Sequence, residues 1–116
     1  MSQSQLLNLT PHPIHLLNSE GQVLATYPPR PIPARAEEIE AYGGHLYVEG
    51  LEDAIHLVKL EFGAVKGLPR VEVGVWLIVS RIVAEACPDH GDLLAPHGMV
   101  RDENGVVIGC TQFSIV

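Results

Sequence analysis

The sequence predicts a mainly β fold with one short helix (α+β), built as a small antiparallel sheet that is curled or closed into a barrel. Hydrophobic residues make up 47% of the 116 residues, yet aromatic residues supply only 5%, so Val, Ile and Leu must fill the core, and branched aliphatic residues favour strands. Proline and glycine interrupt the apolar stretches at short intervals, which is typical of turns between strands. One stretch alone, residues 81–87, has apolar spacing typical of a helix.

The N-terminal region is predicted to form a proline corner followed by a hairpin. Residues 5–9 are expected to be extended and to lead into residues 10–13 (TPHP), where each proline moves the preceding residue out of the helical region. Residues 14–27 are then predicted to form a hairpin, because turn residues at 19–22 separate two apolar runs.

A connector and an ambiguous element come next. Residues 28–33 (PPRPIP) contain four prolines and are expected to connect elements rather than to pair within a sheet. Residues 34–42 have good helix formers but too little apolar periodicity to decide between helix and strand, and both remain open. We expect Gly43 and Gly44 to end this element.

The next region is predicted to be a short strand at residues 45–49, a turn at 50–53 and a longer strand at 54–62. Along the longer strand the side chains alternate between two faces. The face that we expect to look inward carries His56, Val58, Leu60 and Phe62.

The most apolar run of the chain, residues 75–79, is predicted to be a strand buried on both faces. Ser80 follows this strand directly and is a predicted N-cap for a short helix at residues 81–87, which Pro88 would end. We expect a strand, a tight turn and one helix here.

The chain is predicted to finish in a hairpin. Its arms are residues 99–101 and 106–115, and they are joined by residues 102–105, whose Asn-Gly ending favours a tight reversal. The length of 116 residues fits a single domain, residues 1–116.

The charge and the cysteines limit the class of protein. The formal net charge is −7, and seven Lys and Arg residues are scattered along the chain, so no long nucleic acid is expected as a partner, although a few converging arginines could still bind one small anion. Cys87 and Cys110 match no metal spacing and are expected to be reduced thiols. Neither a signal peptide nor a membrane-spanning run is readable, so we expect no membrane partner and a cytoplasmic location, in a bacterial cell or a phage-infected host.

Two catalytic interpretations are weak. A metal site would have to combine His12 and His15 with distant histidines, and no usual zinc spacing occurs, so neither a metal nor a cofactor is predicted. A hydrolase would use Ser80 as its nucleophile, but Ile78 and Ile82 stand where a nucleophile elbow has glycines. No catalytic residue is therefore assigned, and an enzyme is the less favoured class.

An anion-binding site is the better functional interpretation of the same region. A helix that follows a strand leaves its first N–H groups unpaired, and these groups attract negative charge. The predicted ligand-binding residues are Thr10, His12, Arg35, Ser80, Arg81 and Arg101. The structural alternative stays open, in which Ser80 only caps the helix and the proline corner only turns the chain.

Several short motifs resemble those of a family of small uncharacterised proteins encoded in phages and bacterial genomes. They are Asn-Leu-Thr-Pro-His at 8–12, the segment from Gly63 to Gly-Leu-Pro at 67–69, Ile-Val-Ser at 78–80 with Val-Ala at 83–84, and Asp92 with Val-Arg-Asp at 100–102 and Gly105. The family has no established site to transfer, so the matching positions that could serve a site are only candidates: Thr10, His12, Ser80, Asp92 and Arg101.

The functional expectation is a small-ligand-binding protein without enzymatic activity. By analogy with small phage proteins, it could sequester a nucleotide-like signal of host immunity. A structural or host-protein-binding phage protein is the alternative, and a small hydrolase is the second alternative. We also expect a homo-oligomer, because a chain this small and apolar has surface to cover.

Overall fold

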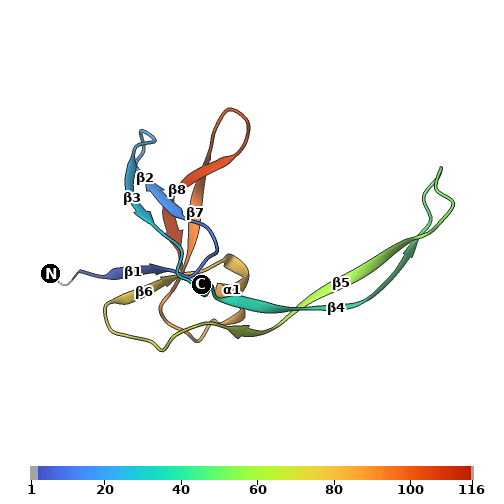
Figure 1. Ribbon diagram of the computed structural model, residues 1–116, viewed down its shortest axis with the longest axis horizontal. Coiled ribbons are helices and arrows are strands. Elements are labelled where there is room, and N and C mark those ends of the chain that lie inside the picture. Colours follow the sequence, from blue (N-terminus) through green and yellow to red (C-terminus); the bar gives the residue numbers. More distant parts are fainter. Residues whose placement is uncertain (1–2, 116) are drawn as a thin grey trace.

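The structure, a computed structural model, describes residues 3–115 and is dominated by strands, which confirms the predicted fold class (Figure 1). The elements in chain order are β1 (Gln5–Asn8), β2 (Ile14–Leu17), β3 (Val23–Tyr27), β4 (Arg35–Leu46), β5 (Ile55–Lys66), β6 (Val75–Ile78), α1 (Arg81–Ala86), β7 (Leu93–Arg101) and β8 (Val107–Ser114). The six-residue α1 is far too short to cross a bilayer, and no longer helix occurs between residues 3 and 115.

Six strands form one curled sheet in the order β1-β6-β7-β8-β2-β3. The β2–β3 hairpin and the β7–β8 hairpin are antiparallel, as predicted. The sheet also contains parallel pairs, β1 with β6, β6 with β7 and β2 with β8. Its two ends approach each other, because Asn8 at the end of β1 bridges to Pro29 just after β3.

The parallel pairing explains the apolar run at residues 75–79. β6 pairs at both edges, with β1 and with β7. Its second half is buried on both faces, since Leu77 and Ile78 are 2% and 0% exposed, whereas Val75 and Trp76 are half-buried. Ser80 then begins the turn into α1, and its Oγ accepts a hydrogen bond of 3.3 Å from the backbone N–H of Val83, which confirms the predicted N-cap.

One hydrophobic core lies between the sheet, α1 and the base of the long hairpin. Val83 and Ala84 of α1 pack there against Leu77 and Val79. Ala36 and Val65, at the base of the β4–β5 hairpin, pack against the edge of the same cluster.

The proline corner at residues 10–13 is organised by Asn8, whose side chain is 1% exposed. Its Nδ2 donates to the carbonyl oxygens of His12 (2.7 Å) and Tyr27 (2.8 Å). Its Oδ1 accepts from the backbone N–H of Thr10 at 2.9 Å and lies 2.7 Å from the Thr10 hydroxyl. One buried amide therefore ties the corner to the end of β3.

Strands β4 and β5, of 12 residues each, form a separate two-stranded sheet that projects from the body (Figure 1). We call this hairpin the arm. Residues 34–42, left open between helix and strand, thus belong mostly to a strand. The prediction that Gly43 and Gly44 end the element is wrong, because β4 continues through them to Leu46 with a bulge opposite Leu57 and Val58.

The bulge explains why residues 43 and 44 are both glycine. A Cβ on Gly43 would lie 2.9 Å from the backbone of Leu57, and Gly44 has a φ of +100°, a backbone conformation that favours glycine. The separate strand predicted at residues 45–49 is likewise absent from the described chain, because only its first two residues are extended and they belong to β4.

The prediction that one face of residues 54–62 looks inward is also wrong. Val58, Leu60 and Phe62 are 54%, 51% and 45% exposed, because the arm projects from the body. Phe62, at the base of the arm, lines an open pocket together with residues of α1. Alternating apolar residues indicate a strand with one apolar face, but they do not show whether anything packs on that face.

The C-terminal hairpin is confirmed, although β7 begins at Leu93, earlier than predicted. Asp102 Oδ1 accepts from the backbone N–H groups of Asn104 (2.9 Å) and Val106 (3.0 Å), and Gly105 has a φ of +80°. Cys87 and Cys110 are free thiols, as expected.

Candidate ligand-binding site

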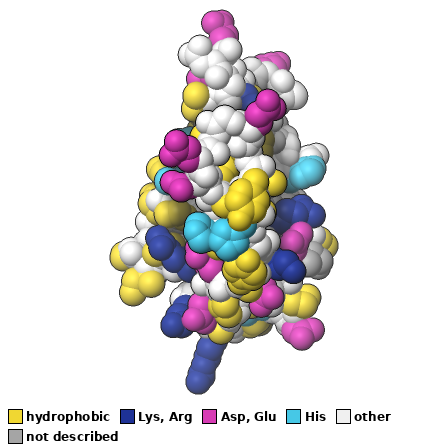
Figure 2. Space-filling model, turned by 90° about the vertical axis from the view of Figure 1, so that its right-hand side faces the viewer, with side chains coloured by type: hydrophobic (Ala, Val, Ile, Leu, Met, Phe, Trp, Pro, Cys, Tyr) yellow, Lys and Arg dark blue, Asp and Glu magenta, His cyan; other side chains and the backbone are white. Residues whose placement is uncertain are grey.

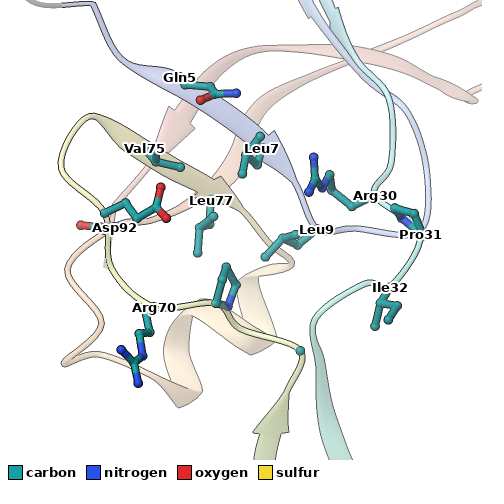
Figure 3. Close-up of a pocket in the computed structure, with 13 residues that line it drawn as sticks. Gln5, Leu7, Leu9, Arg30, Pro31, Ile32, Arg70, Val75, Leu77 and Asp92 are labelled. Carbon is teal, nitrogen blue, oxygen red and sulfur yellow. The ribbon is translucent and has the colours of Figure 1, made fainter.

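A cavity of about 550 Å³ opens between β1, β6, the connector after β3 and the segment after β5 (Figure 3). Its floor is apolar because β1 and β6 pair in parallel with Leu7 beside Leu77, which puts these two side chains on the same face of the sheet. Leu9 and Leu77, which are 5% and 2% exposed, belong to both the floor and the hydrophobic core. The floor is therefore part of the rigid body of the protein.

Two arginines stand at the cavity. Arg30 comes from the proline-rich connector, where its backbone N–H donates to the carbonyl oxygen of Asn8 at 2.9 Å. Arg70 comes from the segment after β5, and Figure 3 shows it on the opposite side of the cavity from Arg30. Within residues 3–115 neither guanidinium is in an ion pair, since the ion pair found there joins Arg81 to Glu85 on α1. Figure 3 also shows that the Arg70 side chain extends away from Leu77, so it must turn inward to meet an anion in the cavity.

Asp92 supplies a carboxylate to the same cavity. Its backbone carbonyl accepts from the N–H of Leu77 at 2.8 Å, which fixes the residue beside β6 at the start of β7. Its Oδ2 is buried and has no hydrogen-bond partner in the part of the chain that the structure describes. Figure 3 shows the carboxylate directed toward Val75 and Leu77. A buried oxygen without a donor costs about 1–3 kcal/mol, and a ligand in the cavity can supply the missing donor once the carboxylate turns toward the open space.

His90 supports the wall of the cavity from the side of the loop before β7. Its Nε2 lies 3.2 Å from the carbonyl oxygen of Pro69, which lines the cavity, and its Nδ1 is buried without a partner among the described residues. Glu72 also lines the cavity, so its charged residues are two arginines and two carboxylates. The site is balanced in charge although the chain is acidic.

Three of the predicted ligand-binding residues meet at a different place. Thr10, Arg35 and Ser80 line an open pocket of about 380 Å³ where the arm meets α1. The hydroxyl of Thr10 already contacts Asn8 Oδ1 and the carbonyl oxygen of His12, and Ser80 Oγ already caps α1. The hydroxyl groups of Thr10 and Ser80 therefore have partners within the protein, whereas the Arg35 guanidinium has none among residues 3–115.

The other three predicted residues lie apart from that pocket and from each other. His12 lines a mostly apolar pocket of about 290 Å³ beside β8. Arg81 Nε donates to Glu85 Oε1 at 2.9 Å on the exposed side of α1. Arg101 Nη1 donates to the carbonyl oxygen of Gly105 at 2.8 Å in the last hairpin. The six residues thus do not form one site in this structure.

Arg30 and Arg70 are candidate residues that the sequence analysis did not single out. The signal that could have found Arg30 is its position between prolines, which hold the backbone rigid around a charged side chain. Arg70 carries no local signal. It reaches the cavity because β5 and β6 are joined by a segment that passes over β1 and β6.

The histidines and cysteines show no sign of a metal centre in residues 3–115, where no three potential ligands are grouped. Burial raises the pKa of the Cys110 thiol above its ordinary value of 9.0, more than hydrogen bonds from the backbone of His97 and Gln112 lower it. This thiol is therefore a core side chain rather than a reactive group.

Comparison of the chain with protein-family models, curated proteins and solved structures finds no match. The resemblance to a phage and bacterial family therefore stays a hypothesis.

Proposed function

We propose that the protein binds a small anionic ligand of nucleotide-like chemistry in the cavity between β1 and β6, without transforming it. The observation that carries the proposal is the buried, unpartnered Oδ2 of Asp92 in a cavity that also presents Arg30 and Arg70. The volume of about 550 Å³ lies within the usual range of small-molecule sites.

The arginines, the carboxylate and the apolar floor of the cavity each favour one chemical group in the ligand. Arg30 and Arg70 favour a phosphate or carboxylate group, which a guanidinium can hold with two parallel hydrogen bonds. Asp92 favours an N–H donor, such as the amino or imino edge of a nucleobase. Leu7 and Leu77 favour a flat apolar ring above them. A nucleotide carries all three groups in one molecule.

The role in the cell would be stoichiometric binding. A protein that holds a nucleotide-like signal lowers its free concentration without any chemistry, and the sequence resemblance suggests a phage protein that acts against host immunity in this way. Support for that role comes from the resemblance alone, whereas the ligand class is argued from the cavity.

Thermal unfolding in the presence of mono-, di- and cyclic nucleotides of each base tests the proposal. A nucleotide present at a hundred times its dissociation constant should add about 2.7 kcal/mol to the stability. Arg30→Ala and Arg70→Ala should each weaken binding about tenfold or more, because each removes a charge-assisted hydrogen bond.

Arg81→Ala is the matched control, because Arg81 is an exposed arginine that is paired with Glu85 away from the cavity. This variant should bind as the unaltered protein does. If no nucleotide shifts the unfolding temperature, or if Arg81→Ala weakens binding as much as Arg30→Ala, the cavity is not the site.

A further inference from the structure

The arm leaves the outer edge of β5 unpaired. Within the described residues β5 pairs only with β4, so its outward N–H and C=O groups have no strand beside them. A two-stranded ribbon is at best marginally stable in water, and stable sheets have three or more strands or a packed layer. The arm is therefore incomplete by itself.

The exposed apolar side chains of the arm also indicate that a partner is missing. Val58, Leu60 and Phe62 on one face are about half exposed, and Ile39 and Leu57 on the other are 45% and 39% exposed. Figure 2, which looks onto the molecule from the end that carries the arm, shows hydrophobic and histidine side chains open to solvent among acidic ones. A strand placed beside β5 would cover part of the apolar row of Val58, Leu60 and Phe62.

We propose that β5 pairs with the β5 of a second copy of this chain. The two strands run antiparallel about a two-fold axis at Leu60, and the pair forms one four-stranded sheet in the order β4-β5-β5-β4. This inference concerns the arm alone and does not depend on the ligand proposed for the cavity.

The charges on β5 favour pairing with a second β5, and they favour one register of that pairing. With the axis at Leu60, Lys59 lies opposite the partner's Glu61, and Glu61 lies opposite the partner's Lys59. Opposite charges on facing residues stabilise antiparallel strands. The sequence of β5 thus complements itself around one residue.

The apolar residues fit the same register. On the other face of the sheet, Leu60 meets the partner's Leu60, and Val58 meets the partner's Phe62, which is a β-branched and aromatic pair of the kind that favours strand pairing. One face of the joined strands is then a continuous apolar stripe, and the other carries the two Lys–Glu pairs.

The two neighbouring registers are worse. A two-fold axis perpendicular to the sheet keeps each face on the same side, so the axis can move along β5 only from one residue to the next, which shifts the pairing by two residues. The next register on one side puts Lys59 opposite the partner's Lys59, and the next on the other side puts Glu61 opposite the partner's Glu61. Facing like charges destabilise both.

The edge of β4 is unsuited to the same role. It carries Glu37, Glu38 and Glu40, and an axis at Ile39 would put Glu38 opposite the partner's Glu40. Rows of like charge are a common means of keeping edge strands apart. The arm therefore has one edge suited to pairing and one that resists it.

Charge exchange tests the register. Sedimentation equilibrium of the full chain should show a dimer, whereas Lys59→Glu and Glu61→Lys alone should each self-associate at least about tenfold more weakly, because each places like charges opposite one another. An equimolar mixture of the two variants should form a dimer again, since every facing pair is then Lys with Glu. The double variant K59E/E61K should dimerise as the unaltered chain does.

These variants are not expected to disturb the arm itself. Within one chain Lys59 lies opposite Ala41, and Glu61 lies opposite Ile39, so neither exchange creates a like-charged pair there. Circular dichroism should show unchanged secondary structure. The mixture also controls for net charge, because it restores association without altering either variant.

Cross-linking gives a second measurement. Facing residues of antiparallel strands have Cα atoms about 4.5–5.5 Å apart, which suits a disulfide, so Leu60→Cys in a Cys87→Ala chain should form a symmetric cross-linked dimer on mild oxidation. Glu40→Cys in the same chain is the control, because Glu40 is the neighbour of Leu60 on β4, and it should stay uncross-linked. A monomeric unaltered chain, single exchanges that still dimerise, or failure of Leu60→Cys to cross-link would each overturn the proposal.

Discussion

At the scale of single residues, the proline corner and the cavity show opposite uses of a buried polar side chain. Asn8 is buried and its side-chain oxygen and nitrogen have partners, so it stabilises the corner. Asp92 has a buried oxygen without a partner, so it lowers the stability of the free protein. A buried polar atom without a partner, as in Asp92, indicates a functional role more often than one that is fully hydrogen-bonded.

Replacing Asn8 should therefore be costly. Asn8→Ala removes two donated and at least one accepted hydrogen bond. The carbonyl oxygen of Tyr27 then loses the donor from Asn8, and that of His12 keeps the Thr10 hydroxyl alone. We expect a loss of about 3 kcal/mol or more in the free energy of unfolding, measured by urea denaturation.

Asn18→Ala is the control for Asn8, because Asn18 makes a similar set of hydrogen bonds to Glu20 and Gln22 in an exposed turn. Water can replace those bonds, so the loss should stay below about 1.5 kcal/mol. Equal losses for the two variants would contradict the structural role of Asn8.

Replacing Asp92 should have the reverse effect on the free protein. Asp92→Ala removes the unpartnered oxygen, so the free energy of unfolding should be unchanged or higher by about 1 kcal/mol, while nucleotide binding is lost. The same denaturation experiment measures it.

Asp102→Ala serves as the comparison for Asp92, because the carboxylate of Asp102 accepts from two backbone N–H groups. This variant should lose about 1–2 kcal/mol. A clear destabilisation by Asp92→Ala would mean that its carboxylate is satisfied in solution and would weaken the argument for a ligand.

At the scale of elements, the features that could be predicted from the sequence are those determined by residues close together in the chain. The apolar run at residues 75–79, the Ser80 cap and the Asn-Gly turn each have a local cause, and each is present in the structure. The corner at residues 10–13 was also recognisable, although the part played by Asn8 was not, because its partners include Tyr27, which is distant in the sequence.

The arm and the cavity could not be predicted in the same way. Alternation along β5 fixed its two faces but not whether anything covers them. Arg30 and Arg70 come to one cavity only because β1 and β6 pair in parallel and the sheet curls, and such contacts leave no periodic pattern in the sequence. The helix start at Ser80 could be predicted, because a serine between an apolar run and a helical pattern is a local signal.

The contact between β2 and β8 provides a test of the sheet. Gly109 lies where the two strands meet, and a Cβ there would be 2.7 Å from the carbonyl oxygen of His15 and 2.8 Å from Leu17 Cγ. Gly109→Ala should therefore cost about 1–3 kcal/mol through overpacking, measured by thermal unfolding.

Gly91→Ala is the matched substitution for Gly109, because a Cβ at Gly91 meets nothing within 4 Å and its φ is not positive. Its effect should stay within about 0.5 kcal/mol. If Gly109→Ala proves equally harmless, β2 does not lie against β8 as described.

At the scale of the whole molecule, the arm dominates the shape. The radius of gyration is 18.2 Å, whereas a compact chain of this length would have about 13 Å. The molecule measures 64 × 38 × 24 Å, and its long dimension follows the arm (Figure 1). The body holds the core and the cavity, and the arm adds surface rather than core.

Shortening the arm should separate these two parts. Replacing residues 39–61 by Asn-Gly, a turn suited to a tight hairpin, keeps Ala36 and Val65 packed on the core. We expect cooperative unfolding, nucleotide binding as in the full chain and a monomer in sedimentation. Loss of cooperative unfolding would show that the arm is required for the body to fold.

The glutamates of β4 have a consequence for how far assembly can go. Sheets that add strands at both edges become open-ended fibres, because each exposed edge can pair with another chain. In the proposed dimer both outermost strands are β4, and each presents its row of carboxylates to the solvent. Further copies would meet repulsion there, so growth of the proposed assembly would stop at two chains.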